Sequence, residues 1–147
     1  MNFFVKLFSN NIFLSGFISW FLAQVFKIFT KLFKTREFDL TRFVGSGGMP
    51  SSHSSLVMGV STAIGLRYGF SHDAYAVSLI YSLIIMYDAS GVRRAVGKQA
   101  IIINRLIKNY YNNKSNKDIK LKELVGHTPV EVIVGAILGV IIANYLY

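Results

Sequence analysis

The sequence predicts an all-α fold, a polytopic integral membrane helical bundle with about four transmembrane helices plus an amphipathic helix. Hydrophobic residues make up 52% of the 147 residues, and the mean hydropathy is +0.44. A soluble domain of this size is less apolar, because it must cover its surface with polar groups. The apolar residues also gather into long runs, whose backbone is satisfied in lipid when they form helices. The length predicts a single membrane-embedded domain over residues 1–147.

Four apolar segments account for the predicted spans, at about residues 12–33, 54–70, 74–89 and 129–147. About 20 residues cross a bilayer core, so the first and last segments are long enough and the middle two are marginal. Large aromatic residues continue the first segment where a cleavage site would need small ones, so we expect no cleaved signal peptide. Close helix packing is expected at three pairs of small residues spaced four apart, namely Gly59 with Ala63, Gly65 with Gly69, and Gly135 with Gly139.

Alternating the directions of these four helices brings four polar clusters to one membrane face. They lie at the end of the first segment, the start of the second, the end of the third and the start of the fourth, over residues 27–36, 45–53, 88–98 and 126–131. We expect them to form one site. Most of the 16 Lys and Arg residues fall on this side, so the positive-inside rule places it in the cytoplasm. The amphipathic helix is expected over residues 97–110, and a polar stretch follows at 111–122.

Charge and cysteine content narrow the expected partners. The net charge is +9 and there is no cysteine. Because the basic residues lie between apolar segments, we expect them to face the headgroups of the lipid bilayer or a phosphate, and not nucleic acid. Without cysteine there is no disulfide framework and no thiolate metal site. Two histidines and a carboxylate make only a weak zinc candidate without an H-E-x-x-H spacing. We therefore expect no metal and no cofactor.

The stretch GGMPSSHSS, residues 47–55, is a turn that enters the second apolar segment. Gly48 supports the turn, and the hydroxyls of Ser51 and Ser52 can cap free N–H groups at a helix end that attracts anions. His53 is placed to give a proton to a leaving oxygen. The same residues also fit an ordinary cap beside a surface histidine.

A second turn, GHTPVE at residues 126–131, enters the last segment. His127 and Glu131 are four residues apart and therefore share one helical face. A carboxylate in this position can fix the imidazole tautomer and strengthen the other ring nitrogen as a nucleophile. Alternatively, Glu131 balances the dipole of a helix that begins at Pro129.

Cations at two further places can hold a phosphate. Arg93 and Arg94 follow the third segment, where paired guanidinium N–H donors suit phosphate oxygens and Asp88 can orient one of the two. Lys27, inside the first segment, can supply a counter-charge. Alternatively, the two arginines only mark the end of a membrane-spanning helix, and the Lys27 side chain only extends to the membrane interface.

Three segments in this order, GGMPSSHSS, MYDASGVRRAVGKQAIIIN and LKELVGHTPVEVIVGAILG, resemble the divergent branch of the type 2 phosphatidic acid phosphatase superfamily, also called acid phosphatase/vanadium-dependent haloperoxidase-related proteins. The resemblance runs from about residue 24 to the C-terminus. It implies a metal-independent phosphohistidine mechanism with His127 as nucleophile, Glu131 orienting it and His53 as the acid. It also implies that Ser51, Ser52 and the following backbone N–H groups hold phosphate oxygens.

The sequence departs from the superfamily pattern at several positions. Leu121 stands where the superfamily has an arginine six residues before the nucleophile, and Glu131 stands in place of an aspartate. Lys27 or Lys34 is the nearest candidate for the lysine of the first motif. Arg93 and Arg94 are the expected replacements for the missing arginine.

The function that we expect is hydrolysis of a membrane lipid phosphate at the cytoplasmic face of a bacterial membrane. Phosphatidylglycerophosphate, phosphatidate and isoprenyl phosphates are the candidate substrates. One alternative is a non-catalytic membrane protein that binds anionic lipid or a partner through the same cluster. Another is a component of a lipid carrier. The sequence indicates no particular oligomeric state.

Overall fold

The computed structural model describes residues 2–35, 48–110, 121–123 and 125–147. All regular structure in these ranges is helical, with the bounds α1 Phe3–Phe8, α2 Asn11–Thr35, α3 Ser52–Tyr68, α4 Asp73–Ser90, α5 Val92–Tyr110 and α6 Pro129–Leu146. The predicted all-helical membrane bundle is confirmed, and the four apolar segments correspond to α2, α3, α4 and α6. The amphipathic helix, α5, begins five residues earlier than expected, and α1 was not predicted. Parts of two predicted polar clusters (36 and 45–47) and most of the polar stretch 111–122 lie outside the described residues.

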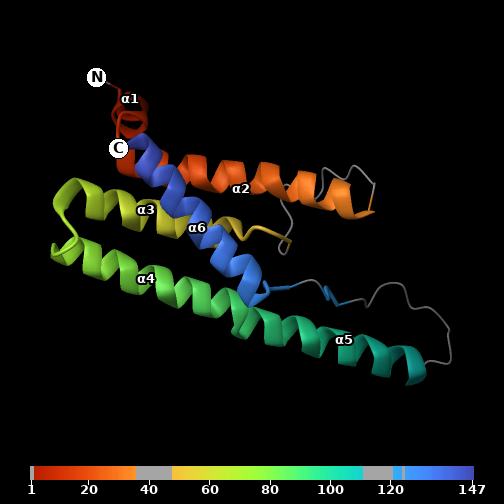
Figure 1. Cartoon of the computed structure of the whole chain (residues 1–147). Helices are drawn as coiled ribbons and strands as arrows, with labels where there is room; N and C mark the ends of the chain where they lie inside the picture. Colours follow the sequence, from red (N-terminus) through yellow and green to blue (C-terminus); the bar gives the residue numbers. More distant parts are fainter. Residues whose placement is uncertain (1, 36–47, 111–120, 124) are drawn as a thin grey trace.

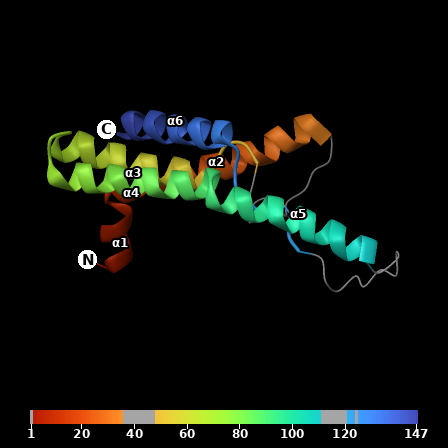
Figure 2. The ribbon, with the colours of Figure 1, turned by 90° about the horizontal axis from the view of Figure 1, so that it is seen from below.

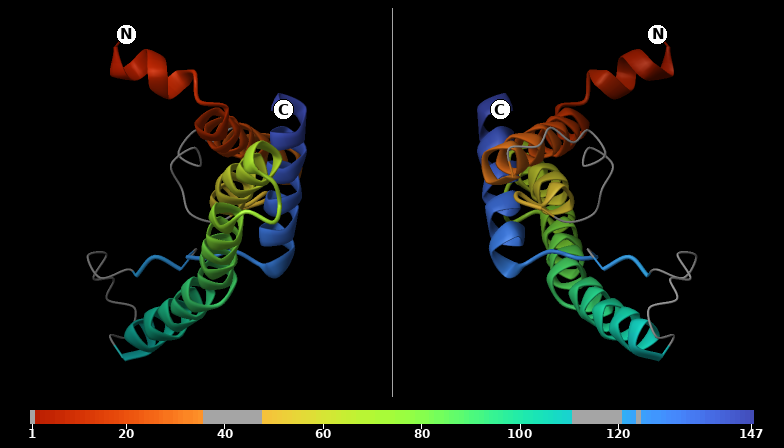
Figure 3. Two further views of the ribbon diagram at one scale, coloured as in Figure 1. Left: turned by 90° about the vertical axis from the view of Figure 1, so that its left-hand side faces the viewer. Right: turned by 90° about the vertical axis from the view of Figure 1, so that its right-hand side faces the viewer.

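α3 is the central helix of the bundle. α2, α3 and α4 lie side by side with alternating directions, and α6 crosses α2 and α3 obliquely (Figure 1). End-on views show the same layers, with α4 and α2 on different sides of α3 (Figure 3). Because α3 packs against α2, α4 and α6, it buries mostly small residues, including several serines.

Several buried hydroxyl groups of the bundle donate to backbone carbonyls. Ser19 Oγ donates to the Ser15 carbonyl at 2.5 Å, and Ser55 Oγ donates across the helix interface to the Ser19 carbonyl at 3.0 Å. Ser82 Oγ of α4 likewise donates to the Val57 carbonyl of α3 at 3.1 Å. Hydrogen bonds of this kind let serines lie inside an apolar bundle, where small side chains also bring helix axes close together.

Glycines make the contact between α3 and α6. A Cβ on Gly135 would collide with the Ser51 carbonyl, and a Cβ on Gly139 would collide with the Ser55 carbonyl and lie 2.8 Å from Gly59 N. The expected packing role of the Gly135 and Gly139 pair is therefore confirmed. The Gly65 and Gly69 pair does not form such a face, because Gly69 has φ +97° and ends α3.

Within the described ranges, three helical stretches are long and apolar enough to cross a membrane. They are Asn11–Phe33 in α2, Asp73–Tyr110 through α4 and α5, and Pro129–Leu146 in α6. α3, the fourth predicted span, has 17 residues and is not one of them. Its neighbours α2, α4 and α6 surround it, so it depends less on an apolar surface facing lipid.

The two ends of the bundle differ in chemistry. α2 and α4 end, and α3 and α6 begin, at one end, while both chain termini lie at the other end (Figure 1). The end at which α3 and α6 begin carries Lys27, Ser52, His127 and Glu131, which belong to the polar clusters predicted from the sequence. α5 continues from α4 after Gly91 and diverges from α3 and α6 (Figure 2).

Candidate active site

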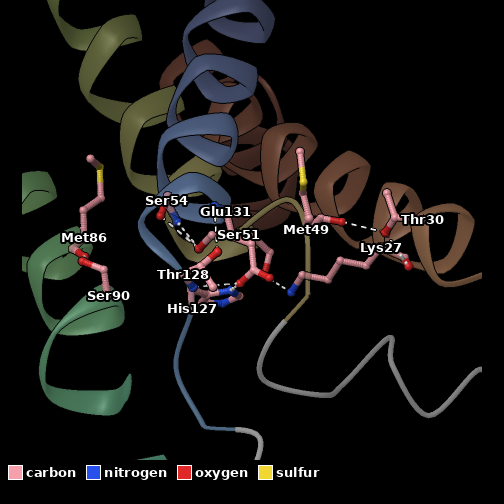
Figure 4. Close-up of polar contacts among 11 residues, drawn as sticks. Lys27, Thr30, Met49, Ser51, Ser54, Met86, Ser90, His127, Thr128 and Glu131 are labelled. Carbon is pink, nitrogen blue, oxygen red and sulfur yellow. Dashed lines mark hydrogen bonds and ion pairs between the residues drawn. The ribbon is translucent and has the colours of Figure 1, made fainter. Parts of the chain in front are cut away.

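A histidine and a carboxylate meet where α6 begins. His127 Nδ1 lies 3.1 Å from Glu131 Oε2, and only 4% of His127 is exposed. Thr128 caps α6 by accepting from Glu131 N–H, and the same Glu131 oxygen accepts from Thr128 N–H at 3.0 Å (Figure 4). Glu131 thus caps the helix and holds the imidazole, which combines the two interpretations of the sequence. With a proton on Nδ1 for this bond, the lone pair is on Nε2.

A buried lysine reaches the same place from α2. The Lys27 side chain is 4% exposed, and its Nζ donates to Ser52 Oγ in the first turn of α3 at 3.0 Å. It extends from α2 toward the start of α6 (Figure 4), so its ammonium group is turned into the protein and does not snorkel outward. Thr30, one turn further along α2, donates to the Met49 carbonyl at 2.8 Å and ties α2 to the turn before α3.

Ser51 and Gly48 support this arrangement from the turn that enters α3. The hydroxyl of Ser51 accepts from Ser54 N–H and is bonded to Ser54 Oγ at 2.9 Å, so it caps α3. Ser51 N–H donates to the Glu131 carbonyl at 2.9 Å, which fixes the start of α3 against α6. Gly48 has φ +95°, which favours glycine, and its backbone interacts with the His127 imidazole.

His53 and Arg93 form the open side of the cluster. His53 is exposed in the first turn of α3, where the charges of Arg93 and Lys27 and the His127 ring act on it. Arg93 is oriented by Asp88, with Nε donating to Oδ2 at 2.6 Å, as the sequence suggested. The backbones of Arg93 and Arg94 both lie against Gly126, so the turn before His127 packs on the first turn of α5.

The pKa values of both histidines are lowered. His127 lies just before α6, and His53 lies just before the apolar part of α3. Burial is the main cause for His127, and Lys27 adds to it, whereas the bond to Glu131, its charge and the Gly48 backbone raise the pKa. Desolvation also lowers the pKa of His53, followed by the charges of Arg93 and Lys27. Both rings are therefore neutral near pH 7 when no anion is bound, and an anion between these cations would raise the pKa of His53.

The segment before His127 is held along α5, a contact that the sequence did not predict. The Asn104 side chain pairs with both backbone groups of Leu121, at 2.9 and 3.0 Å, and donates to Glu123 at 2.8 Å. A Cβ on Gly97 would meet the carbonyls of this segment at 2.7 and 2.8 Å. His127 N–H then donates to the Ala89 carbonyl of α4 at 2.9 Å. The detectable sign is the small and amide side chains at positions 97, 100 and 104, which share one helix face.

Other candidate residues lie apart from this cluster or outside the described part. His72 caps α4 at the opposite end of the bundle, where its Nδ1 accepts from Ala74 N–H at 3.1 Å. The backbone of Leu121, the position of the superfamily's arginine, is bound by Asn104. The Lys34 side chain is not among those described. Among the residues that the structure describes, no three His, Cys, Asp or Glu side chains group as metal ligands.

The fold and site define a class: a helical integral membrane protein with two histidines, a carboxylate and buried or oriented cations at one end of the bundle. Within that class, the chain belongs to the Divergent PAP2 family, whose sequence profile matches residues 8–142. This match confirms the resemblance that the sequence motifs indicated. The family's relation to phosphatases points to a phosphatase-related role.

A curated relative covers almost the same length. The chain is 37% identical over 153 residues to "Uncharacterized membrane protein YuiD" of Bacillus subtilis (strain 168), and the match covers 97% of each chain. No solved structure matches the chain. The relative supports an integral membrane protein, in agreement with the spanning helices.

Proposed function

We propose that this protein is a membrane lipid phosphatase that uses His127 as a nucleophile and His53 as a general acid and base. The observation that carries the proposal is the buried His127–Glu131 pair at the start of α6, with the Lys27–Ser52 pair beside it at the start of α3. A buried ammonium group next to a neutral imidazole favours an anion between them. A lipid phosphate brings that anion to the membrane surface.

In the first step, Nε2 of His127 attacks phosphorus and the bond from phosphorus to the lipid oxygen breaks. Glu131 accepts the Nδ1 proton in a hydrogen bond and stabilises the positive charge that develops on the ring as the nitrogen becomes bonded to phosphorus. The lowered pKa of His127 keeps the ring neutral and nucleophilic at neutral pH.

Lys27, Ser52 and Arg93 hold the phosphate oxygens during this step. Lys27 and Ser52 already share a hydrogen bond, so the ammonium and hydroxyl groups are directed to one place. Arg93 is held by Asp88 and contributes from the open side. Fixed positive charge of this kind stabilises the charge on the transferring phosphoryl group. Ser51, whose hydroxyl caps α3, supports Ser52 without touching phosphate.

His53 moves the protons. Bound phosphate raises its pKa, so the imidazolium donates a proton to the leaving lipid oxygen and releases the lipid alcohol. The neutral ring then takes a proton from water as the water oxygen attacks the phosphohistidine. The bond between phosphorus and Nε2 breaks, inorganic phosphate leaves, and His127 is restored.

The site faces the cytoplasm in this proposal, because the basic residues gather at its end of the bundle. Lipid phosphates made in that leaflet are the substrates: phosphatidylglycerophosphate, phosphatidate or isoprenyl phosphates. The headgroup would enter between the starts of α3 and α6 while the acyl or isoprenyl chain stays in the bilayer.

The direct test is phosphate release by the full-length protein purified in detergent and supplied with each of the three lipid classes. We expect one class to be hydrolysed, with vanadate inhibiting the reaction because it mimics the pentacoordinate transition state. His127→Ala should abolish release and His53→Ala should slow it, whereas His72→Ala, at the opposite end, should leave it unchanged.

Two results would contradict the proposal. In one, every lipid phosphate remains intact while wild-type and His127→Ala proteins bind anionic lipid equally, as a non-catalytic binding protein would. In the other, a lipid phosphate is hydrolysed at the same rate by the wild type and the His127→Ala variant. Circular dichroism of each variant controls for loss of the helical fold.

A further inference from the structure

We infer that α5 lies along the headgroup layer of an anionic membrane surface, with one apolar side in the lipid and one basic side toward lipid phosphates. This inference concerns a surface outside the candidate active site and does not depend on catalysis. Three observations support it, namely the length of α4 and α5 together, the division of α5 into faces, and its charge.

The helical stretch Asp73–Tyr110, formed by α4 and α5, is longer than a bilayer core is thick. Its 38 residues would extend about 57 Å as one helix, whereas the core is about 30 Å thick. α4, with 18 residues, already covers about 27 Å. α5 therefore has to leave the core, and it does so after the break at Gly91, where it turns away from the bundle (Figure 2).

Most cations and most exposed apolar residues of α5 lie on different sides, with Ile101 as an exposed apolar residue among the cations. One side, at helical spacing, is apolar and exposed, formed by Val92, Val96, Ile103 and Leu106. A second side carries cations, formed by Arg94, Lys98, Arg105 and Lys108. Gly97, Ala100 and Asn104 lie between them on a third side, which the segment leading to His127 covers. In the described part of the chain, α4 is the helix that α5 contacts, and the apolar side is left exposed.

Charge favours an anionic lipid surface over a second copy of this chain. α5 contains five cations and no carboxylate in its 19 residues. The nearby carboxylates are engaged, since Asp88 pairs with Arg93 and Glu123 accepts from Asn104. Two copies of α5 packed on their apolar sides would bring their basic flanks together, which is repulsive. An anionic leaflet accepts the apolar side and neutralises the cations, as for other basic amphipathic helices.

The absence of cysteine allows a clean test with single labels. Val96→Cys and Leu106→Cys place a fluorophore on the apolar side, and Lys98→Cys places one on the basic side. Each full-length variant is reconstituted in phosphatidylcholine vesicles with and without phosphatidylglycerol. Quenching is measured with nitroxide lipids and with aqueous iodide, and a label at Leu83 of α4 is the reference for the bilayer core.

With phosphatidylglycerol present, we expect nitroxide lipids to quench the labels at 96 and 106, and iodide to quench the label at 98. The phosphatidylglycerol content is then titrated with Lys98 and Arg105 replaced by Gln in the Val96→Cys protein. The equilibrium constant for binding of α5 to the membrane surface, followed by quenching of the label at 96, should fall by about fivefold per cation removed. Arg67→Gln, at the opposite end, should not change it.

Two results would overturn the inference. Iodide reaching labels at 96 and 106 as readily as the label at 98 would mean that α5 projects into water. Oxidative cross-linking of Leu106→Cys between molecules, with no quenching by nitroxide lipids, would mean that a second copy covers the apolar side. Both measurements are independent of phosphatase activity, so a failed activity assay would leave this conclusion intact.

Discussion

Glu131→Gln tests the catalytic role of the carboxylate without removing its cap. Gln at this helix position still accepts from Thr128 N–H, because glutamine also forms capping boxes. The substitution removes the negative charge that stabilises the imidazole ring as it becomes positive. A hydrogen bond to a charged partner contributes about 1.5–3 kcal/mol, which corresponds to about 10- to 150-fold in kcat.

The same substitution makes a signed prediction for the pH profile. Glu131 raises the pKa of His127 through its hydrogen bond and charge, against the lowering by burial. Glutamine should therefore lower the pKa of His127 further. Because the proposed nucleophile is the neutral ring, activity declines as the pH falls through this pKa. The acid limb of kcat/KM should move to lower pH in Glu131→Gln.

The assay is phosphate release from the preferred lipid phosphate across the pH range, in detergent. Thr128→Val is the matched control, because it removes the cap hydroxyl, costs about 1 kcal/mol of stability, and leaves the Glu131 charge in place. Its acid limb should coincide with that of the wild type. An acid limb that stays in place or moves to higher pH in Glu131→Gln, or a plateau equal to that of the wild type, would refute this role of Glu131.

Three further predictions concern His53 as the general acid, the packing of α6 on α3, and the positioning of His127 by Asn104. His53→Ala should slow hydrolysis of an alkyl phosphate by about 10²- to 10⁴-fold but affect an aryl phosphate much less, since that leaving group needs no proton; equal losses would argue against an acid role. Gly139→Val should lower the melting temperature in detergent by roughly 4–8 °C, for about 2 kcal/mol of overpacking against α3, whereas the exposed Ile137→Ala should change it little. Asn104→Ala should release the segment before His127 and lower kcat with KM unchanged; a change in KM alone would contradict a positioning role.

The sequence predicted α2 to α6, though not α1, and the end of the bundle at which His127, Glu131, Lys27 and Ser52 meet. Apolar runs, capping residues and the alternation of helix directions depend on local composition and chain connectivity, so they can be read directly. The contact of His127 with Glu131 was also predicted, but for a different reason. His127 lies just before α6, and the capping box of Thr128 and Glu131 turns the carboxylate back toward it.

Tertiary packing decided the features that the sequence could not reveal. Whether Lys27 snorkels or turns inward depends on Ser52, which lies 25 residues away. The small and amide side chains at positions 97, 100 and 104 mark a contact face on α5, but not the segment that packs there, since Asn104 binds backbone groups 17 residues away.

Trapping the covalent intermediate tests the central claim most directly. The protein is mixed with its lipid phosphate, quenched at alkaline pH and digested, and the peptide that contains residue 127 is examined by mass spectrometry. We predict an acid-labile phosphoryl group on His127 that is absent from His127→Ala and present in His72→Ala. Continued phosphate release by the His127→Ala protein, or a phosphoryl group on another residue, would contradict the mechanism.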